Sequence, residues 1–261
     1  MRAGLIGAGH MAHALGQGWS RPGLAEPPAL SFFDISSEAA THAAADTGAA
    51  VAPTLSALIE GADLILVAVR PQHVAGVLAD VAPLLGSRPL VSVAAGVSLK
   101  VLRDGLEDDA RVGRAMPNVA AALGLGVFLF VPGTLGESQP AIERLLGLCG
   151  EVVPVAETEF DSATAVAGCM PGILAGLVRD FARAGVERGL DEDVARRLAI
   201  AGVHGAAAVI AREGDPDAVI AAAATPGGMT AAAIAALEEH EIATAVARAV
   251  HAAAERAKEL T

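Results

Sequence analysis

Short apolar runs alternate with longer mixed segments of helix-like composition over residues 1–155. The run at 64–69 is continuously apolar, which is typical of a parallel strand buried on both faces. This alternation predicts an α/β domain with a parallel-rich sheet covered by helices on both faces. Strands are expected at 3–7, 30–33, 64–69, 90–95, 111–115, 126–131 and 151–155, and helices at 10–19, 36–47, 54–60, 73–85, 98–106 and 138–149.

From residue 156 to residue 261 the strand pattern is gone and only helical runs follow. We therefore expect two domains, at 1–155 and 156–261, the second all-helical. Asp191 is a candidate N-cap. One apolar face of the last helix needs a cover, which suggests a homodimer or higher homo-oligomer. That face comprises Ile242, Val246, Ala249, Ala253, Ala257 and Leu260, and breaks are expected at Pro171-Gly172, Gly189-Leu190-Asp191, Gly214-Asp215-Pro216 and Pro226-Gly227-Gly228.

The composition excludes several classes of partner. The chain is 53% apolar and has a formal net charge of −12, which argues against binding to nucleic acid or anionic membranes. Its uncharged stretches at 115–136, 162–178 and 218–237 are interrupted by Pro and Gly, so we interpret them as buried or site-lining segments rather than membrane spans. Two cysteines and no signal-peptide pattern after Met1 favour the cytoplasm.

The first strand-like run ends in GAGHMA, where Gly7, Gly9 and Ala12 match the G-x-G-x-x-G/A fingerprint. The motif follows a strand and opens a helix, as dinucleotide binding requires. Gly7 permits the tight turn, and Gly9 lets the backbone approach a pyrophosphate. The helix start, with His10 and Met11, offers free N–H groups to phosphates. A Rossmann domain that binds a dinucleotide is expected, with a tight turn that binds nothing as the alternative.

The second strand ends at Asp34, 25 residues beyond Gly9. A carboxylate at this place accepts hydrogen bonds from ribose hydroxyls and favours NAD(H). No Arg or Lys lies between Asp34 and Leu55, so a 2′-phosphate finds no nearby cation, although Ser36 and Ser37 offer hydroxyls. The sequence thus slightly favours NADH and leaves NADPH open.

Further strand ends are expected at the same edge of the sheet, where ligands of open α/β sheets bind. Small residues there let a flat nicotinamide ring approach the backbone, whereas ordinary turn chemistry is the alternative explanation. These cofactor-binding candidates are Ala68, Val69, Arg70 and Pro71 after the run at 64–69, Ala94, Ala95 and Gly96 after that at 90–95, and Asn118 in the Met116-Pro117-Asn118 turn.

The segment TPGGMT, residues 225–230, precedes an alanine-rich helix. Gly227 and Gly228 let the backbone turn and expose N–H groups, and Thr230 adds a hydroxyl. That arrangement suits an anion such as a substrate carboxylate. A plain helix start with Thr230 as its cap explains the residues equally well.

Taken together, the motifs resemble pyrroline-5-carboxylate reductase over nearly the whole chain. They are GLIGAGHMAHAL, AVRPQ, SVAAGVSL, RAMPNVAAALGLG, EFDSATAVAGCMPG, DPDAVIAAAATPGGMTAAAIAALEE and AAAERAKEL. The resemblance implies an NAD(P)H-binding Rossmann domain, a helical domain that dimerises by intertwining, and reduction of the cyclic imine 1-pyrroline-5-carboxylate to proline. It also implies catalytic roles for Thr230, Thr225 and Glu213, and substrate binding by Cys169, Met170, Pro171, Gly227, Gly228 and Met229.

The chain departs from the family in four places. Thr225 stands where serine is usual. Arg70 stands where lysine is usual, and His10 where asparagine is usual. The family segment S-G-S-G-P-A-Y, which wraps the substrate carboxylate, is here A-G-C-M-P-G-I at residues 167–173. Loss of one charge-assisted hydrogen bond there costs about 1.5–3 kcal/mol. A reductase of another cyclic imine, or a non-catalytic nucleotide-binding dimer, therefore remains an alternative.

Other chemistry is not expected. Hydride transfer to an electrophilic imine carbon needs positioning more than acid–base groups. His10 and His13 lie one helical turn apart but have no third ligand, so no metal site is predicted. Cys169 has apolar neighbours in sequence and is expected to be an inert buried thiol.

Overall fold

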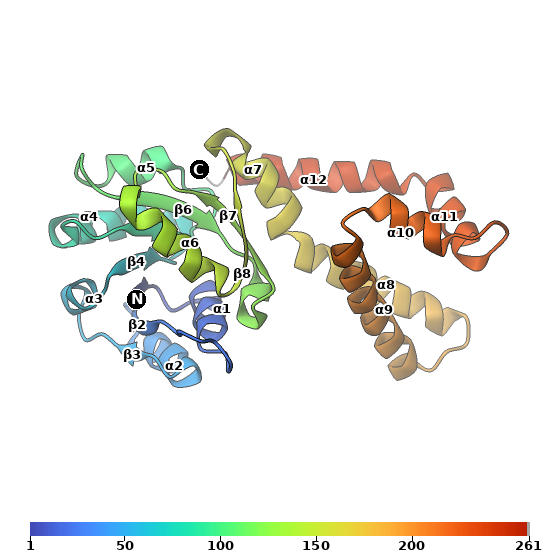
Figure 1. The fold of residues 1–261 in the computed structure, drawn as a ribbon, viewed down its shortest axis with the longest axis horizontal. Helices are drawn as coiled ribbons and strands as arrows, with labels where there is room; N and C mark the ends of the chain where they lie inside the picture. Colours follow the sequence, from blue (N-terminus) through green and yellow to red (C-terminus); the bar gives the residue numbers. More distant parts are fainter. Residues whose placement is uncertain (260–261) are drawn as a thin grey trace. The chain divides into compact units, whose positions relative to one another are not determined.

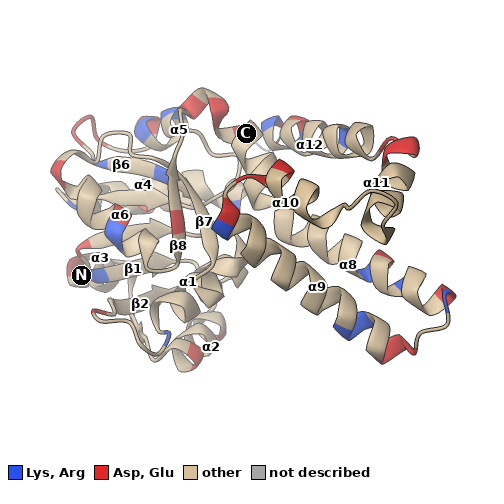
Figure 2. Ribbon diagram, turned by 45° about the vertical axis from the view of Figure 1, so that its right-hand side comes forward, with Lys and Arg blue, Asp and Glu red and all other residues tan. Residues whose placement is uncertain are grey.

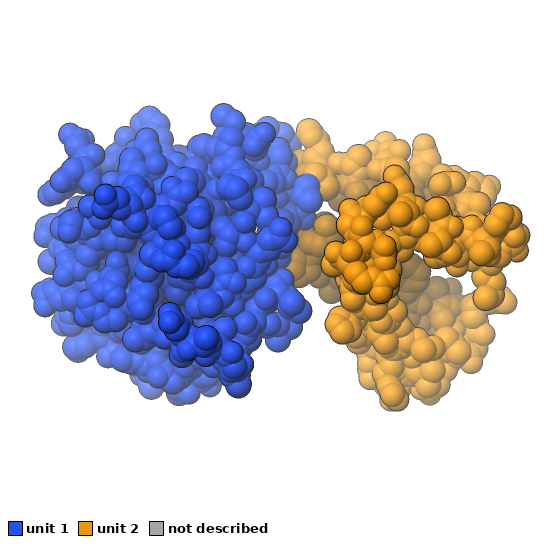
Figure 3. Space-filling model, in the orientation of Figure 1, with its two compact units in different colours: residues 1–169, 252–261 blue, residues 170–251 orange. Residues whose placement is uncertain are grey.

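The computed structural model describes residues 1–259, and the chain divides into two compact units (Figure 3). The first comprises residues 1–169 and the chain from residue 252 onward, and the second comprises residues 170–251. The strands end at Pro154, next to the predicted boundary at 155, whereas packing divides the chain at residue 169. Leu260 of the predicted apolar face lies outside the described residues.

The first unit is built on an eight-stranded sheet in the order β3-β2-β1-β4-β5-β6-β7-β8 (Figure 1). Neighbouring strands are parallel except β6 and β7, which are antiparallel. From β1 the chain adds β2 and β3 on one side, and β4 to β8 then follow on the other side, so the strand order reverses between β1 and β4. The strands are β1 (Arg2–Ile6), β2 (Ala29–Phe33), β3 (Ala50–Val51), β4 (Leu64–Val67), β5 (Leu90–Ser92), β6 (Val112–Met116), β7 (Gly126–Val131) and β8 (Gly150–Pro154).

Helices cover both faces of this sheet because its strands are apolar on both sides. One buried cluster joins side chains of α1, α2 and α6 to the sheet, and another joins those of α3, α4 and α5. In β7, Phe128 and Phe130 belong to the first cluster, and Leu129 and Val131 to the second. The helices are α1 (His10–Trp19), α2 (Ser37–Thr47), α3 (Leu55–Gly61), α4 (Val74–Leu85), α5 (Leu99–Asp104) and α6 (Gln139–Gly147), with 3-10 turns η1 (Pro71–His73), η2 (Val119–Leu123), η3 (Gly136–Ser138) and η4 (Glu157–Glu159).

The rest of the chain is helical, as predicted. It comprises α7 (Phe160–Ala163), the π-helical turn η5 (Thr164–Gly168), α8 (Met170–Glu187), α9 (Glu192–Glu213), α10 (Pro216–Ala223), α11 (Met229–Glu239) and α12 (Ile242–Lys258). Asp191 caps α9, as expected, because its Oδ1 accepts hydrogen bonds from the backbone N–H groups of Asp193 and Val194.

Three local features differ from the expectations. β3 was not predicted, because it has only two residues and both are exposed. The break expected at Pro171-Gly172 lies two residues earlier, at Cys169 between η5 and α8. Pro171 is the second residue of α8, where a missing N–H costs no intrahelical hydrogen bond. Between α11 and α12, Glu241 has a φ of 53°, a turn that the sequence pattern does not indicate.

The helices of the second unit leave most of their apolar side chains exposed. Among its described residues only Ala195 is buried, while Phe181, Leu198 and Ile200 are exposed. Figure 2 shows few charged residues along the middle of α9, and none occurs from Leu198 to Ala211. Glu157–Glu187 and Glu192–Glu213 are long and apolar enough to cross a membrane by length and composition alone.

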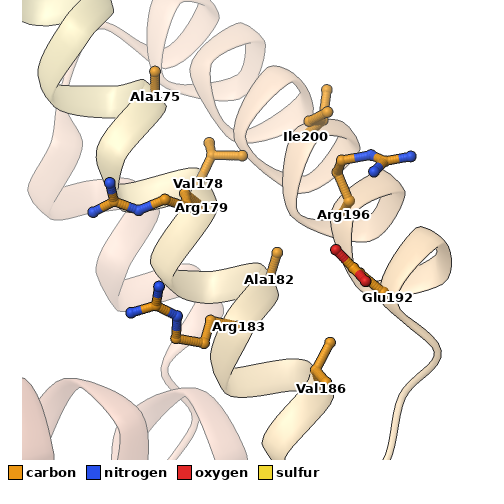
Figure 4. Close-up of a pocket in the computed structure, with 9 residues that line it drawn as sticks. All are labelled: Ala175, Val178, Arg179, Ala182, Arg183, Val186, Glu192, Arg196 and Ile200. Carbon is orange, nitrogen blue, oxygen red and sulfur yellow. The ribbon is translucent and has the colours of Figure 1, made fainter.

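A cavity of about 460 Å³ lies between α8 and α9 within the second unit (Figure 4). Apolar side chains such as Val178 and Ile200 line it, and Arg179, Arg183 and Arg196 surround it. In a single chain, the apolar side chains of α8 and α9 that surround this cavity stay exposed to solvent.

Gly18 lies where α1 packs closely against η2 and Cys149, which leaves no room for a side chain. A Cβ at Gly18 would lie 2.2 Å from the carbonyl oxygen of Ala121 and 2.6 Å from Sγ of Cys149. We expect Gly18→Ala to lower the free energy of unfolding by about 1–3 kcal/mol. The measurement is urea unfolding followed by the fluorescence of Trp19, the only tryptophan, which is buried in the same helix and donates from Nε1 to the carbonyl of Leu145 at 2.8 Å.

Gly61→Ala is the matched control, because no atom lies within 4 Å of the Cβ it would gain. Its higher helix propensity should leave stability unchanged or raise it by about 0.5–1 kcal/mol. Equal urea midpoints for the two variants would contradict the close packing of α1.

Candidate active site

The turn between β1 and α1 has the geometry that phosphate binding requires. Gly7 has a φ of 97°, and its N–H donates to the carbonyl of Phe33 at 2.8 Å. Gly9 is the N-cap of α1, and no side chain caps the helix start within the described residues. The first N–H groups of α1 are therefore free to meet an anion.

Asp34 fixes this turn. Its Oδ2 accepts a hydrogen bond from the N–H of Ala8 at 2.8 Å, and its Oδ1 accepts one from the N–H of Ser36 at 2.8 Å. The hydroxyl of Ser36 in turn accepts from the N–H of Ala39 and caps α2. One carboxylate thus joins the end of β2 to the starts of both α1 and α2.

A cavity of about 410 Å³ opens beside the turn, where the strand order reverses between β1 and β4. Ligands of open α/β sheets bind at such points. Six predicted cofactor-binding residues line it together, from three different strand ends: Gly7, Gly9, Asp34, Ala68, Val69 and Arg70. Ile6, Phe33, Ile35, Leu55, His73, Gly76, Val77 and Asp80, which the sequence did not single out, complete the lining.

Arg70 changes the expected electrostatics of the cavity. The sequence interval after Asp34 contains no cation up to Leu55, but Arg70 follows β4 and lines the same cavity as Asp34. Asp80 lines it as well, so two carboxylates face one guanidinium there. Arg70 is far from Asp34 in the sequence but lines the same cavity in the fold, and it supplies the positive charge there.

The remaining cofactor-binding candidates follow the ends of β1, β2, β4, β5 and β6 but do not line this cavity. Asn118 is buried, and its side chain is engaged inside the unit: Oδ1 accepts from the N–H of Ala120 at 3.2 Å, and Nδ2 donates to the carbonyl of Ala167 at 3.3 Å. Its contact with the cofactor stays a prediction, as do those of His10, Met11, Ser36, Pro71, Ala94, Ala95 and Gly96.

In the second unit, the TPGGMT segment forms an uncapped helix start. Gly228 is the N-cap of α11 and has no side-chain cap, and its N–H donates to the carbonyl of Thr225 at 2.9 Å. Gly227 has a φ of 72°, which requires glycine in practice. Thr230 is the second residue of the helix and not its cap, so the local-cap interpretation is wrong. Met229 is 92% exposed.

Residues 167–173 form no loop in this chain. The π-helical turn η5 ends at Gly168, Cys169 has helical dihedrals, and α8 begins at Met170. Cys169 is half-buried rather than buried, which corrects the expectation for this thiol. The fully enclosed thiol is that of Cys149, whose pKa burial raises to about 12. Glu213 ends α9 and pairs with Arg212.

An ion pair that was not predicted from the sequence joins buried Arg114 to half-buried Glu157. Nη1 of Arg114 donates to Oε1 of Glu157 at 2.9 Å, and the guanidinium carbon lies 3.6 Å from the centroid of the Phe160 ring. Oε1 of Glu157 also accepts from the N–H of Leu99 at 2.9 Å. The one available indication was an arginine inside an otherwise apolar strand.

Comparison with known proteins identifies the family. A family model described as pyrroline-5-carboxylate reductase dimerisation matches residues 157–260, and one described as NADP oxidoreductase coenzyme F420-dependent matches residues 2–96. Pyrroline-5-carboxylate reductase of Methanosarcina acetivorans is 32% identical over 263 residues, covering 99% of this chain and 97% of the relative. The chain belongs to the pyrroline-5-carboxylate reductase family.

Solved structures agree with this assignment. 1-Pyrroline-5-carboxylate reductase of Streptococcus pyogenes is 28% identical, with a TM-score of 0.86 over 99% of this chain and 98% of that one. The Plasmodium falciparum enzyme, solved with NADP bound, has a TM-score of 0.88 over 100% and 98% of the two chains, but at 24% identity it supports the fold alone. The predicted Rossmann and helical architecture is confirmed, and the cofactor class of this reductase family is a nicotinamide dinucleotide.

The two glycines of the turn make separable predictions. A Cβ at Gly9 meets no atom within 4 Å, because the space beside it is open. We expect Gly9→Ala to retain the thermal stability of the wild type but to weaken binding of the nicotinamide cofactor at least tenfold, or about 1.4 kcal/mol. Fluorescence titration with NADH and NADPH, beside a thermal melt, measures both quantities.

Gly7→Ala should lower both stability and affinity. Its Cβ would lie 2.9 Å from Cγ1 of Val69 and 3.0 Å from the carbonyl oxygen of Ala68, at a φ that disfavours alanine. Unchanged cofactor affinity in Gly9→Ala would show that the pyrophosphate does not pass over this turn.

Proposed function

We propose that the protein reduces 1-pyrroline-5-carboxylate to L-proline with NAD(P)H, as an oxidoreductase acting on a C=N bond. The observation that carries this is the glycine turn fixed by Asp34 at the switch point of the sheet, in a chain that matches the family over 99% of its length. The nicotinamide, when bound, would supply a hydride to the carbon of the protonated imine, whose nitrogen keeps its proton and becomes the secondary amine of proline. The residues of this chain bind, orient and shield the reactants.

The uncapped start of α11 is the proposed anchor for the substrate carboxylate. Its free N–H groups and the positive end of the helix favour an anion. Thr230 is proposed to act at the ring nitrogen through its hydroxyl, with Thr225 and Glu213 beside the substrate. Because Cys169 and Met170 bring no hydroxyl groups, the carboxylate depends more heavily on Gly227, Gly228 and Met229 than in the usual family pattern, while Pro171 holds the first turn of α8.

NADH is the proposed preferred cofactor. Asp34 and Asp80 place two carboxylates in the cavity against the single guanidinium of Arg70, so its charge disfavours an additional 2′-phosphate. Both oxygens of Asp34 are held by backbone N–H groups, which keeps the carboxylate where ribose hydroxyls are expected. Arg70 leaves a measurable activity with NADPH.

The protein is proposed to work as a homodimer or larger homo-oligomer in the cytoplasm, without nucleic acid or membrane partners. The matched dimerisation model spans residues 157–260, which include both stretches apolar enough to cross a membrane. A second copy of the chain would cover these apolar side chains at a lower free-energy cost than a bilayer would, because Arg179, Arg183 and Arg196 lie among them and charged side chains are expensive to place in lipid.

Activity with 1-pyrroline-5-carboxylate is the decisive test. We expect the purified protein to oxidise NADH with this substrate and Thr230→Val to lower kcat/KM about 10–100-fold, because one hydrogen bond to the reacting ring is lost. Thr41→Val is the control: Thr41 is exposed on α2 and bonds only to its own helix, so activity should not change.

The triple variant Ala167→Ser, Cys169→Ser, Met170→Gly completes this experiment. Turnover by the triple variant alone would assign the wild type to a different cyclic imine. Nucleotide binding without turnover in either protein would contradict the reductase function.

Cofactor preference is tested by the ratio of kcat/KM for NADPH to that for NADH. A variant that only loosens the glycine turn lowers kcat/KM for both cofactors, and this shared effect cancels in the ratio. Asp34→Ser should raise this ratio about tenfold by removing the negative charge. Arg70→Gln should lower it, because the 2′-phosphate loses its only cation among the residues lining the cavity.

Asp80→Asn removes the same charge from the same cavity and is the matched control, expected to change the ratio less than Asp34→Ser. A wild type that uses NADPH better than NADH would contradict the proposed preference.

A further inference from the structure

Two histidines and an aspartate gather between α1 and α2, on the first unit. Nε2 of His13 lies 3.1 Å from Oδ2 of Asp46, and Nδ1 of His42 lies 3.8 Å from the same oxygen. One ligand atom from each of the three side chains lies within 4.8 Å of the others. His42 and Asp46 are four residues apart on α2, so they share one face of that helix.

The contacts within this cluster leave His13 unsatisfied. Its Nε2 is shielded from solvent and has no hydrogen-bond partner among the described residues, although Asp46 is close. The ring of His42 meets that of His13 edge-on, with centroids 5.5 Å apart. A shielded polar atom without a hydrogen-bond partner calls for another ligand such as an ion, and in the tautomer protonated at Nδ1 the lone pair of Nε2 is available to bind one.

We propose that His13, His42 and Asp46 bind a divalent transition metal, with zinc as the best match. Two imidazole nitrogens and one carboxylate oxygen are ligands that zinc prefers, and water completes the tetrahedron. Ligand atoms about 2.1 Å from a tetrahedral zinc lie about 3.4 Å apart. The separations from Asp46 Oδ2 to the two histidine nitrogens are 3.1 and 3.8 Å, and all three ligand atoms lie within 4.8 Å of one another, so a small rotation of the His42 ring brings the set to this geometry. His42 is 70% exposed and free to turn its ring toward the ion.

The ion would act as a clamp between the two helices. α1 begins at the glycine turn and α2 begins after Ser36, so both helix starts border the nucleotide cavity through Asp34. Joining the helices by metal bonds stabilises the folded first unit by mass action, because the unfolded chain does not hold the three ligands together.

Participation of His42 separates this site from a simple ion pair. A pair between His13 and Asp46 needs neither His42 nor a metal. A metal site needs all three side chains, and exposed His42 can be changed without disturbing the core.

The test compares the chelator-treated full-length protein with and without zinc chloride. At a tenfold excess of free Zn²⁺ over its dissociation constant, the Tm of the wild type should rise by about 3–6 °C. Native mass spectrometry should show one more bound zinc per chain in the wild type than in His42→Gln or Asp46→Asn, and both variants should lose the Tm shift.

Glu38→Gln removes a carboxylate from the same helix, and His251→Gln removes an imidazole from α12. Both controls should retain the wild-type zinc content and Tm shift. The proposal is overturned if zinc leaves the wild-type Tm unchanged or lowers it, or if His42→Gln gives the same shift and zinc content as the wild type.

Discussion

The two hydrogen bonds accepted by the Asp34 carboxylate hold together the part of the fold on which cofactor binding depends. They fix the N–H of Ala8 inside the glycine turn and the N–H of Ser36 at the entrance to α2. Since charge-assisted bonds to backbone N–H groups are stronger than neutral ones, the positive φ of Gly7 is maintained rather than merely permitted. The open cavity at the sheet's switch point follows from this fixed turn.

The two units achieve their stability differently. In the first, apolar side chains on both faces of the sheet are enclosed by six helices. In the second, the described helices bury almost nothing, and α9 carries no charge from Leu198 to Ala211. Exposed apolar surface of this extent is typical of an interaction surface, in agreement with the dimerisation family model that matches residues 157–260.

The sequence predicted the strands of the first unit other than β3, and its helices α1 to α6, to within a few residues, because strands buried on both faces leave continuous apolar runs between glycine-bounded turns. It failed where the decisive relation was spatial. Arg70 reaches the Asp34 cavity from the end of β4, and His13 lies beside His42 and Asp46 of the neighbouring helix, a grouping that the sequence did not indicate. Pro171 misled because proline at a helix start and proline as a helix breaker look alike in one sequence.

The ion pair of buried Arg114 and half-buried Glu157 explains how the helical region leaves the sheet. The pair ties β6 to η4, and Glu157 also accepts from the N–H that begins α5. Nε and Nη2 of Arg114 have no partner among the described residues, so the pair adds little net stability. The pair instead fixes the position of η4 relative to β6, because a shift of one residue would leave the buried guanidinium of Arg114 without its carboxylate. Asn118 fixes a second point by donating to the carbonyl of Ala167. The segment from Glu157 to Ala167, which precedes Cys169, is therefore held at both ends. Cysteine in place of the usual serine at residue 169 thus changes the side-chain group rather than the position of the backbone.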